Sequence, residues 1–229
     1  MINSIINLQI QDKIPRPGKT GIDWYLFCYF LNKFKNKPIL EIGVGNGGSL
    51  YTITSFSDQV TAIDNWRFNW DKSTVENNLK SINQTVNFID LDSRDVSIDT
   101  QFNFVHLDAN KSYIGTIEDL ELAKQLCTGI ICVDDYMNSV WPEVTWAVDD
   151  FVEKNSNWGK IIIGNHQVFL TNIKIDIKEL VLEFPLVNRM DTFYLTYGTL
   201  PSKVDKFVGN ANMQYTWHNL VWGNDKDRL

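Results

Sequence analysis

The sequence contains few positive charges and concentrates them nowhere. Lys and Arg together number 21 against 28 Asp and Glu, which gives a net charge of −7. In the densest basic stretch, residues 33–37, the lysines alternate with other residues. Proteins that bind nucleic acids usually carry a concentrated basic surface, because contacts with phosphates supply much of the affinity. The composition therefore disfavours a nucleic-acid partner.

Long apolar runs are absent as well. No run approaches the roughly 18 residues that can span a bilayer, and residues 1–4 lack the basic start of a secretory signal. We therefore expect a soluble, cytoplasmic protein with no membrane partner. Cysteine is also scarce: Cys28, Cys127 and Cys132 are odd in number and have no metal-ligand spacing, which favours buried, reduced thiols.

Apolar runs that alternate with polar or helical segments make up most of the chain. The 229 residues, 44% of them hydrophobic, suit one enlarged domain over residues 1–229. The spacing of apolar residues predicts a helix over 21–35. Strands are predicted at 39–42, 60–63, 86–89, 104–107 and 130–133, and a hairpin at 160–164 and 167–171. This pattern predicts an α/β, doubly wound, mostly parallel sheet with an antiparallel edge hairpin and helices on both faces.

A glycine-rich turn follows the first predicted strand. Residues 38–49 read PILEIGVGNGGS. A buried parallel strand that leads into a turn of glycines is where open α/β sheets bind nucleotides. Gly43, Gly45 and Gly48 also match the dinucleotide pattern GxGxxG, so the glycines alone do not distinguish NAD from another adenosine-containing cofactor.

Glu41 favours one of these cofactors. It lies two residues before Gly43 on the same side of the strand, where a carboxylate would repel the pyrophosphate of a dinucleotide. S-adenosylmethionine has no phosphate and carries an ammonium and a sulfonium, so an acid at this position favours it. Asp64, which follows the second predicted strand, can accept the two ribose hydroxyls of either cofactor.

Acids also end the next two strands of the predicted sheet. Asp108 follows the fourth predicted strand, and Asp134 and Asp135 follow the fifth. Because parallel strands end at one edge of a sheet, we expect these acids to converge beside the cofactor. Three carboxylates in one place repel one another unless a cation neutralises them, and all-oxygen ligation suits Mg²⁺ better than zinc. The sequence therefore predicts a magnesium site.

Such a metal site suits methyl transfer to oxygen. The transfer is an in-line displacement, so the protein mainly has to align a hydroxyl and remove its proton. Binding to Mg²⁺ lowers the pKa of a hydroxyl, and two adjacent hydroxyls can chelate the ion. We therefore expect a small-molecule diol or catechol-like acceptor. The alternative interpretation of Asp134 and Asp135 is a pair of helix-capping or loop acids.

At these residues the chain resembles the class I S-adenosylmethionine-dependent methyltransferases, through residues 41–48 and Asp64. More narrowly, it is similar to the metal-dependent sugar O-methyltransferases of the macrocin and mycinamicin type. The matching motifs are FVHLD at 104–108, KSY at 111–113, VDDY at 133–136, WPEV at 141–144 and AVDDF at 147–151. The likeness covers residues 16–171 and leaves 172–229 unassigned.

The resemblance implies a Rossmann-like methyltransferase sheet and a role for each matching residue. Asp108, Asp134 and Asp135 correspond to the metal ligands and Asp64 to the ribose acceptor, while an acid and a serine of the third-strand motif lie near the adenine. The implied cofactor-binding set is Glu41, Gly43, Gly45, Gly47, Ser49, Asp64, Asn65, Asp92, Ser93 and Asp108. Residues 1–35 are then an N-terminal arm and helix, 36–171 the cofactor-binding core, and 172–229 an extension that could cap the acceptor.

The chain departs from the family pattern at the catalytic base. The family often has an acid followed by histidine where this chain has Asn110 and Lys111. Asp108 and Lys111 are the candidate catalytic residues, and Lys111 serves as a base only if burial or the metal lowers its pKa. A solvated helix-start lysine, or one that holds a substrate phosphate or carboxylate, is an equal alternative. His106, inside the fourth predicted strand, is interpreted as structural.

These expectations combine into an O-methyltransferase that uses S-adenosylmethionine and Mg²⁺ and acts on a hydroxyl of a sugar, a nucleotide sugar or a glycosylated natural product. A metal-independent N- or O-methyltransferase, an NAD-dependent oxidoreductase and a binding protein with a decayed site are the alternatives. Acceptor recognition is expected from Arg16, Trp66, Trp141 and the residues after 172. The aromatic content is compatible with a homo-oligomer.

Overall fold

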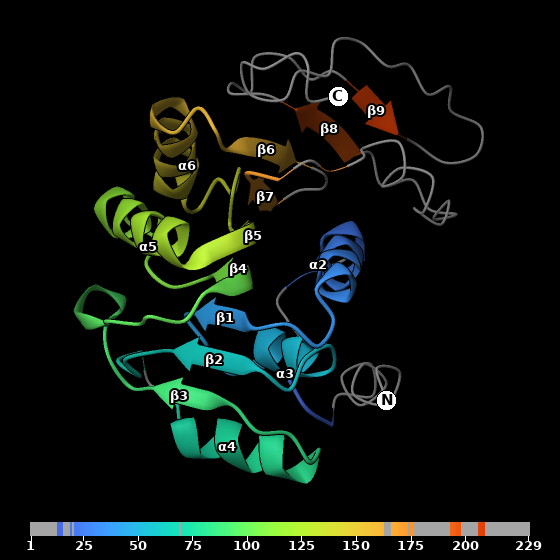
Figure 1. Cartoon of the computed structure of the whole chain (residues 1–229), viewed down its shortest axis with the longest axis vertical. Helices are drawn as coiled ribbons and strands as arrows, with labels where there is room; N and C mark the ends of the chain where they lie inside the picture. Colours follow the sequence, from blue (N-terminus) through green and yellow to red (C-terminus); the bar gives the residue numbers. More distant parts are fainter. Residues whose placement is uncertain are drawn as a thin grey trace.

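Nine strands form a sheet in the order β3-β2-β1-β4-β5-β7-β6-β8-β9, with helices packed against it (Figure 1). The computed structural model describes residues 13–15, 19, 21–68, 70–162, 166–173, 175, 193–197 and 206–208. The strands are β1 Ile39–Ile42, β2 Val60–Ile63, β3 Asn87–Ile89, β4 Phe102–Leu107, β5 Cys127–Asp134, β6 Gly159–Ile162, β7 Gln167–Thr171, β8 Phe193–Tyr197 and β9 Lys206–Val208. The helices are α2 Gly21–Lys33, α3 Gly48–Thr54, α4 Lys72–Ser81, α5 Tyr113–Leu126 and α6 Pro142–Lys154, with a 3-10 turn, η1, at Ser93–Asp95.

The first five strands are all parallel, as predicted. β1 pairs with β2 on one side and with β4 on the other, so the strand order reverses between β1 and β4. β3 and β5 extend the sheet outward from these pairs. The predicted bounds of the first two strands match the structure, whereas β4 and β5 begin earlier than predicted, at Phe102 and Cys127.

The other side of the sheet is antiparallel. β7 lies between β5 and β6 and runs antiparallel to both, which confirms the predicted antiparallel hairpin, although the hairpin does not lie at the edge of the sheet. Two further strands continue the sheet: β8 pairs with β6, and β9 pairs with β8. Beyond residue 175 only β8 and β9 are described, so the predicted capping role of 172–229 lies largely outside the described residues.

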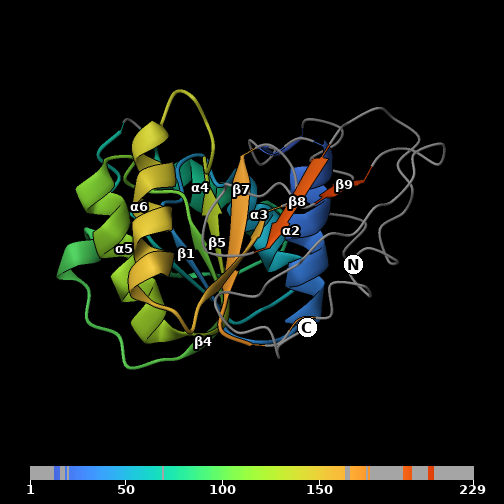
Figure 2. The same cartoon turned by 90° about the horizontal axis from the view of Figure 1, so that it is seen from above.

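Two hydrophobic layers cover the two faces of the sheet. Figure 2 shows α5 and α6 on one side of the strands and α2 on the other. Successive residues of β1 enter opposite layers: Ile39 packs with residues of α2 and α3, and Leu40 packs with residues of α5 and α6. The predicted arrangement of helices on both faces is therefore confirmed. It follows from the alternation of side chains along strands that are buried on both faces.

Local sequence signals explain where the helices begin. The side chain of Ser112 accepts a hydrogen bond from the backbone N–H of Gly115 and caps α5, and Asp71 caps α4 in the same way. Pro142 is the first residue of α6, a position where the absent N–H costs nothing. The predicted helix over 21–35 is α2, which ends two residues earlier.

The cysteines match the expectation of reduced thiols. All three are free; Cys127 and Cys132 are buried and Cys28 is partly buried. Burial raises the pKa of the Cys127 thiol to about 12, so it does not ionise readily. Among the described residues, no helix combines the length and the apolar composition needed to cross a bilayer.

The glycine turn brings β1 close to β4. Gly43 has φ +87° and Gly45 has φ +56°, a region that residues with a side chain rarely adopt. A Cβ at Gly43 would lie 2.4 Å from the backbone oxygen of Asp108. A Cβ at Gly45 would come no nearer than 3.6 Å to Trp70. Of these two glycines, Gly43 is therefore required for close packing as well as for backbone conformation, whereas Gly45 is required for backbone conformation alone.

Gly43→Ala should destabilise the protein more than Gly45→Ala does. Both variants strain a backbone with positive φ, at about 1 kcal/mol each, and the clash with the Asp108 backbone adds about 2 kcal/mol at Gly43 alone. Urea unfolding monitored by circular dichroism measures both changes. Equal losses of stability in the two variants would contradict the role given to the contact between Gly43 and Asp108.

Candidate functional site

Four strands end at one edge of the sheet, and candidate residues follow each of them. These residues are Gly43 after β1, Asp64 after β2, Asp108 after β4 and Asp134 at the end of β5. The register aligns Ile42 with Leu107, and Leu107 with Val133, so the ends of β1, β4 and β5 are level. This edge includes the reversal between β1 and β4, where open α/β sheets bind their ligands.

Asp64 is fixed to the glycine turn. Its Oδ2 accepts hydrogen bonds from the backbone N–H groups of Val44 at 2.7 Å and Gly45 at 3.1 Å. Its Oδ1 accepts one from the backbone N–H of Trp66 at 2.7 Å. A carboxylate oxygen has two acceptor positions, so Oδ1 can accept one more hydrogen bond. The predicted contact with a ribose hydroxyl remains a prediction.

Asn65, Asp92 and Ser93 connect the ends of β2 and β3 with α5. Asn65 Nδ2 donates to Asp92 Oδ2 at 3.1 Å, and the Arg94 guanidinium donates to both oxygens of Asp92 at 2.7 and 3.0 Å. This pairing with Arg94 holds the pKa of Asp92 well below its usual range. Ser93 Oγ donates to Asp119, a carboxyl whose pKa is raised to about 6 by burial. The structure thus gathers these residues beside Asp64, and their adenine role stays a prediction.

Glu41 does not face an open cofactor space as the sequence argument assumed. Its side chain is fully buried, on the sheet face covered by α2, because it shares the orientation of Ile39. Ser49 Oγ donates to Glu41 Oε1, and His106 Nδ1 lies 2.9 Å from the same oxygen. Burial raises the pKa of Glu41 to about 8, despite the opposing hydrogen bond from Ser49. The carboxyl therefore keeps its proton at neutral pH.

His106 lies at the site although its sequence position indicated only a structural role. The ring is fully buried, and burial lowers the pKa of His106, so the imidazole is neutral. Among the described residues, Glu41 Oε2 and His106 Nε2 have no hydrogen-bond partner. One ring nitrogen of His106 and one oxygen each of Asp108 and Asp134 lie within 4.8 Å of one another. The register of β1 with β4, which pairs Glu41 with His106, is what brings the two side chains together.

Two lysines contact the three acids that were predicted to bind a metal. Lys111 Nζ lies 2.5 Å from Asp108 Oδ1 and 2.6 Å from Asp135 Oδ2. Lys19 Nζ lies 2.8 Å from Asp134 Oδ2, and its side chain is only 2% exposed. The sequence argument assigned the neutralising charge to Mg²⁺, whereas the structure has ammonium groups at these oxygens. Sequence reasoning missed Lys19, since no pattern in the N-terminal arm distinguishes it.

These ion pairs set the protonation states at the acids. Burial alone would lower the pKa of Lys111, but the charges of Asp108 and Asp135 outweigh it and raise that pKa. A lysine base needs a lowered pKa, so the condition under which Lys111 was expected to act as a base is not met. Burial and the charge of Asp134 raise the pKa of Asp108 to about 6. Lys19 outweighs the opposite effect of burial and holds the pKa of Asp134 well below its usual range.

The loop after β5 is fixed by a buried polar group. Asp135 and Met137 both have positive φ, at +64° and +62°, which costs energy for residues other than glycine. Tyr136 between them is buried, and its hydroxyl donates to Asp149 Oδ1 at 2.9 Å. Lys160 Nζ donates to the same oxygen at 2.6 Å. These contacts with α6 and β6 hold the strained loop in the conformation that directs Asp135 toward Lys111.

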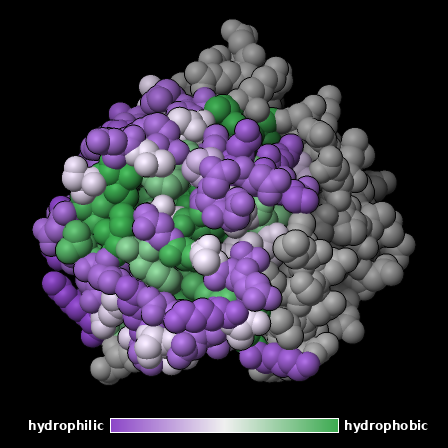
Figure 3. Space-filling view, turned by 60° about the horizontal axis from the view of Figure 1, so that its bottom comes forward, coloured by the Kyte–Doolittle hydropathy of each residue, from purple (hydrophilic) through white to green (hydrophobic). Residues whose placement is uncertain are grey.

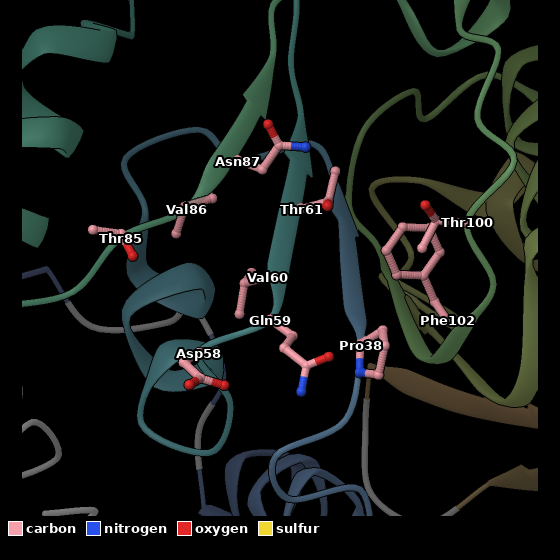
Figure 4. A pocket seen from close by; sticks show the side chains of 10 residues that line it. All are labelled: Pro38, Asp58, Gln59, Val60, Thr61, Thr85, Val86, Asn87, Thr100 and Phe102. Carbon is pink, nitrogen blue, oxygen red and sulfur yellow. The ribbon is translucent and has the colours of Figure 1, made fainter.

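The cavities of the described part differ in size and position. One of about 430 Å³ lies at the opposite, amino-terminal edge of the sheet, with Asp58, Gln59, Thr61 and Asn87 among its lining residues (Figure 4). Its lining lacks any cluster of acids, bases or nucleophiles. Another, of about 10 Å³ and with room for about one water, is lined by residues that include Lys111 and Asp134. The chemically equipped edge is therefore the carboxyl edge.

Comparisons with known proteins establish the fold. No family model and no curated protein matches the sequence. A Streptococcus mutans protein described as a methyltransferase, in complex with SAH, is 12% identical with a TM-score of 0.55, over 68% of this chain and 100% of that chain. A SAM-dependent O-methyltransferase of Thermotoga maritima is 12% identical with a TM-score of 0.57, over 75% of this chain and 72% of that one. A Clostridium thermocellum protein described as an rRNA methylase is 16% identical with a TM-score of 0.56, over 68% and 100%. The chain thus has the Rossmann-like methyltransferase fold.

Glu41→Gln should change how stability depends on pH. In the unfolded chain Glu41 loses its proton near its ordinary pKa of 4.5, whereas the folded protein keeps it up to about 8. The protonated Glu41 therefore makes its full contribution to the free energy of unfolding below pH 4.5. This contribution is lost as the pH rises to 8, at up to about 1.4 kcal/mol per pH unit. Gln cannot ionise, so the variant should gain stability relative to the wild type across this range.

Urea unfolding at several pH values measures this difference. Glu118→Gln, at an exposed position on α5, is the matched control and should follow the wild type. Parallel pH profiles for the wild type and Glu41→Gln would show that the buried carboxyl does not keep its proton.

Proposed function

We propose that this protein is an S-adenosylmethionine-dependent O-methyltransferase that acts on a hydroxyl of a small molecule. The main support is the position of the glycine turn and Asp64, at the strand-order reversal of a methyltransferase fold and directly beside the acids that follow β4 and β5. The structural neighbours supply the fold, and the side chains at this edge supply the reason for assigning the activity.

The turn fits S-adenosylmethionine better than a dinucleotide. Dinucleotide sites bind pyrophosphate through the backbone N–H groups of the glycine turn. Here the N–H groups of Val44 and Gly45 already donate to Asp64. A phosphate at the same N–H groups would also meet the negative charge of Asp64. This arrangement favours S-adenosylmethionine over the NAD-dependent alternative.

The cofactor would be held by residues that follow β1, β2 and β3. Gly43, Gly45 and Gly47 shape the turn, Asp64 and Asn65 follow β2, and Asp92 and Ser93 follow β3. The buried Glu41 supports the turn indirectly through Ser49, at the start of α3. When bound, S-adenosylmethionine supplies a methyl group activated by the sulfonium. The chain's contribution is to position it next to the ends of β4 and β5.

The acceptor hydroxyl would lie between Asp108 and the loop after β5. Asp108 follows β4 and its backbone packs against Gly43, so Asp108 lies next to the glycine turn that would hold S-adenosylmethionine. We assign Asp108 as the group that orients the hydroxyl and accepts its proton. Lys111 holds Asp108 and Asp135 in place through its ion pairs. The role of Lys111 is therefore electrostatic rather than that of a base.

The predicted Mg²⁺ has suitable oxygen donors but meets competing charges. Asp108, Asp134 and Asp135 are hard carboxylate ligands of the kind Mg²⁺ prefers. Each of them, however, contacts a lysine ammonium in this structure. These ion pairs compete with a resident metal ion for the carboxylates, so the proposed mechanism uses none.

A sugar or nucleotide sugar is the proposed acceptor. Hydrophobic residues reach the surface of the described part (Figure 3). Most of the large exposed ones follow the carboxyl ends of strands: Phe68, Trp70, Leu91, Ile114, Met137, Val140 and Trp141. Aromatic side chains with solvent-exposed edges suit ligands that have both apolar and hydroxyl-bearing faces. A net charge of −7 opposes an RNA acceptor, although the structural neighbours include proteins described as rRNA methylases.

SAH should stabilise the wild type, and Asp64→Ala should remove most of this effect. A ligand at a hundred times its Kd adds about 2.7 kcal/mol, which corresponds to a rise of about 5–10 °C for a chain of this size. The variant loses both the ribose acceptor and the anchor of the glycine turn. Differential scanning fluorimetry measures the shift.

Asp58→Ala is the matched control for this experiment. Asp58 precedes β2 at the opposite edge of the sheet, so its removal should leave the shift with SAH unchanged. A shift with NAD and none with SAH would instead establish the oxidoreductase alternative.

Asp108→Asn should lower turnover by about two orders of magnitude or more and retain the thermal shift with SAH, because it removes a positioned proton acceptor. Methyl transfer to a panel of nucleotide sugars, diols and a structured RNA is the assay. Asp99→Asn, at an exposed position before β4, is the control. Full activity of Asp108→Asn would exclude the proton-accepting role, and methylation of RNA alone would exclude the proposed acceptor class.

A further inference from the structure

Lys111 occupies the position at which Asp108 and Asp135 could share a cation. Its Nζ lies 2.5 Å from one carboxylate and 2.6 Å from the other, and its side chain is 18% exposed. Mg²⁺ requires carboxylate oxygens at about 2.0–2.1 Å in near-octahedral geometry. A divalent ion bound between this pair of acids would compete with the ammonium, because the two cations would lie at the same two carboxylates and repel each other.

The bridge is part of the local structure rather than a surface contact. Asn110 Oδ1 accepts from the backbone N–H and the hydroxyl of Ser112, which fixes the turn that presents Lys111. On the other side, Asp135 is directed by a backbone with positive φ that the buried Tyr136 holds in place. Both ends of the bridge are thus also held by contacts other than the ion pair.

Lys19 is a second fixed cation, and it neutralises the remaining acid. Its ammonium lies 2.8 Å from Asp134 and 5.0 Å from the centre of the Phe27 ring, with almost no exposed surface. When the Gln167 amide is oriented so that both of its ends are satisfied, its oxygen accepts from Lys19 Nζ at 2.7 Å. A buried ammonium with this set of partners would leave an uncompensated charge if a metal took Asp134 from it.

We propose that Lys19 and Lys111 replace the divalent metal of this site, with Lys19 neutralising Asp134 and Lys111 binding the acceptor, so that the protein works without Mg²⁺. Two of the three N–H groups of Lys111 are accounted for by Asp108 and Asp135, which leaves the third to donate to an acceptor oxygen. The inference rests on the proposed function for the identity of the acceptor, while the nature of the cation is tested separately.

Titration with Mn²⁺, followed by its electron paramagnetic resonance signal, tests the proposal on the full chain. In the presence of the wild type, the Mn²⁺ signal should remain that of the free ion. Lys111→Met removes the competing charge and should bind Mn²⁺ at least about tenfold more tightly, since two unneutralised carboxylates attract a divalent cation. Binding of one Mn²⁺ per chain by the wild type, or no gain of affinity in Lys111→Met, would overturn the proposal.

Lys72→Met is the matched control. Lys72 also pairs with an aspartate, Asp90, at 2.5 Å and lies near Glu76, but on the exposed side of α4. Its removal should create no Mn²⁺ site. A gain equal to that of Lys111→Met would show that any freed surface acid accounts for the effect, and would overturn the proposal.

Thermal melts of the wild type give a second readout that needs no variant. The melting temperature should be the same in EDTA and in excess Mg²⁺. A rise with Mg²⁺ that Asp134→Asn abolishes would overturn the proposal. Failure of SAH to stabilise the protein would count against the proposed function alone, whereas metal binding by the wild type would count against this inference alone.

Discussion

Compensation of negative charge at the carboxyl edge of the sheet is the constraint on which the site depends. Parallel strands that start from one edge must all end at the other, so their terminal acids gather there. Each acid is compensated differently: Asp64 by backbone N–H groups, Asp108 and Asp135 by Lys111, and Asp134 by Lys19. Among the described residues no charged cation contacts Glu41, which avoids the charge by keeping its proton.

The kind of compensation separates the two halves of the site. On the side that would hold the cofactor, Asp64 accepts hydrogen bonds from the N–H groups of Val44 and Gly45. These N–H groups are then not available to bind phosphate. On the acceptor side, the ammonium of Lys111 still has one N–H group to donate. A cofactor without phosphate therefore fits the glycine turn beside Asp64. An acceptor rich in oxygen atoms fits the strand ends beside Lys111.

The sequence predicts the fold well because the fold depends on local patterns. The runs at 39–42 and 60–63 are each apolar at three of their four positions, and the glycine turn and the acids lie directly at strand ends. The charge balance depends instead on contacts between distant residues. Lys19 and Asp134 are 115 positions apart, and no periodicity relates them. The burial of Glu41 likewise depends on how α2 packs over β1, which the sequence of the strand does not reveal.

The close approach of Gly43 to Asp108 joins the two halves. A methyl group can be transferred in line only when donor and acceptor are held at a defined separation. Here that separation is set by backbone against backbone, since even a Cβ at Gly43 would lie 2.4 Å from the Asp108 carbonyl oxygen. A glycine whose conformation first suggested a cofactor turn therefore also fixes the distance across which the reaction would occur.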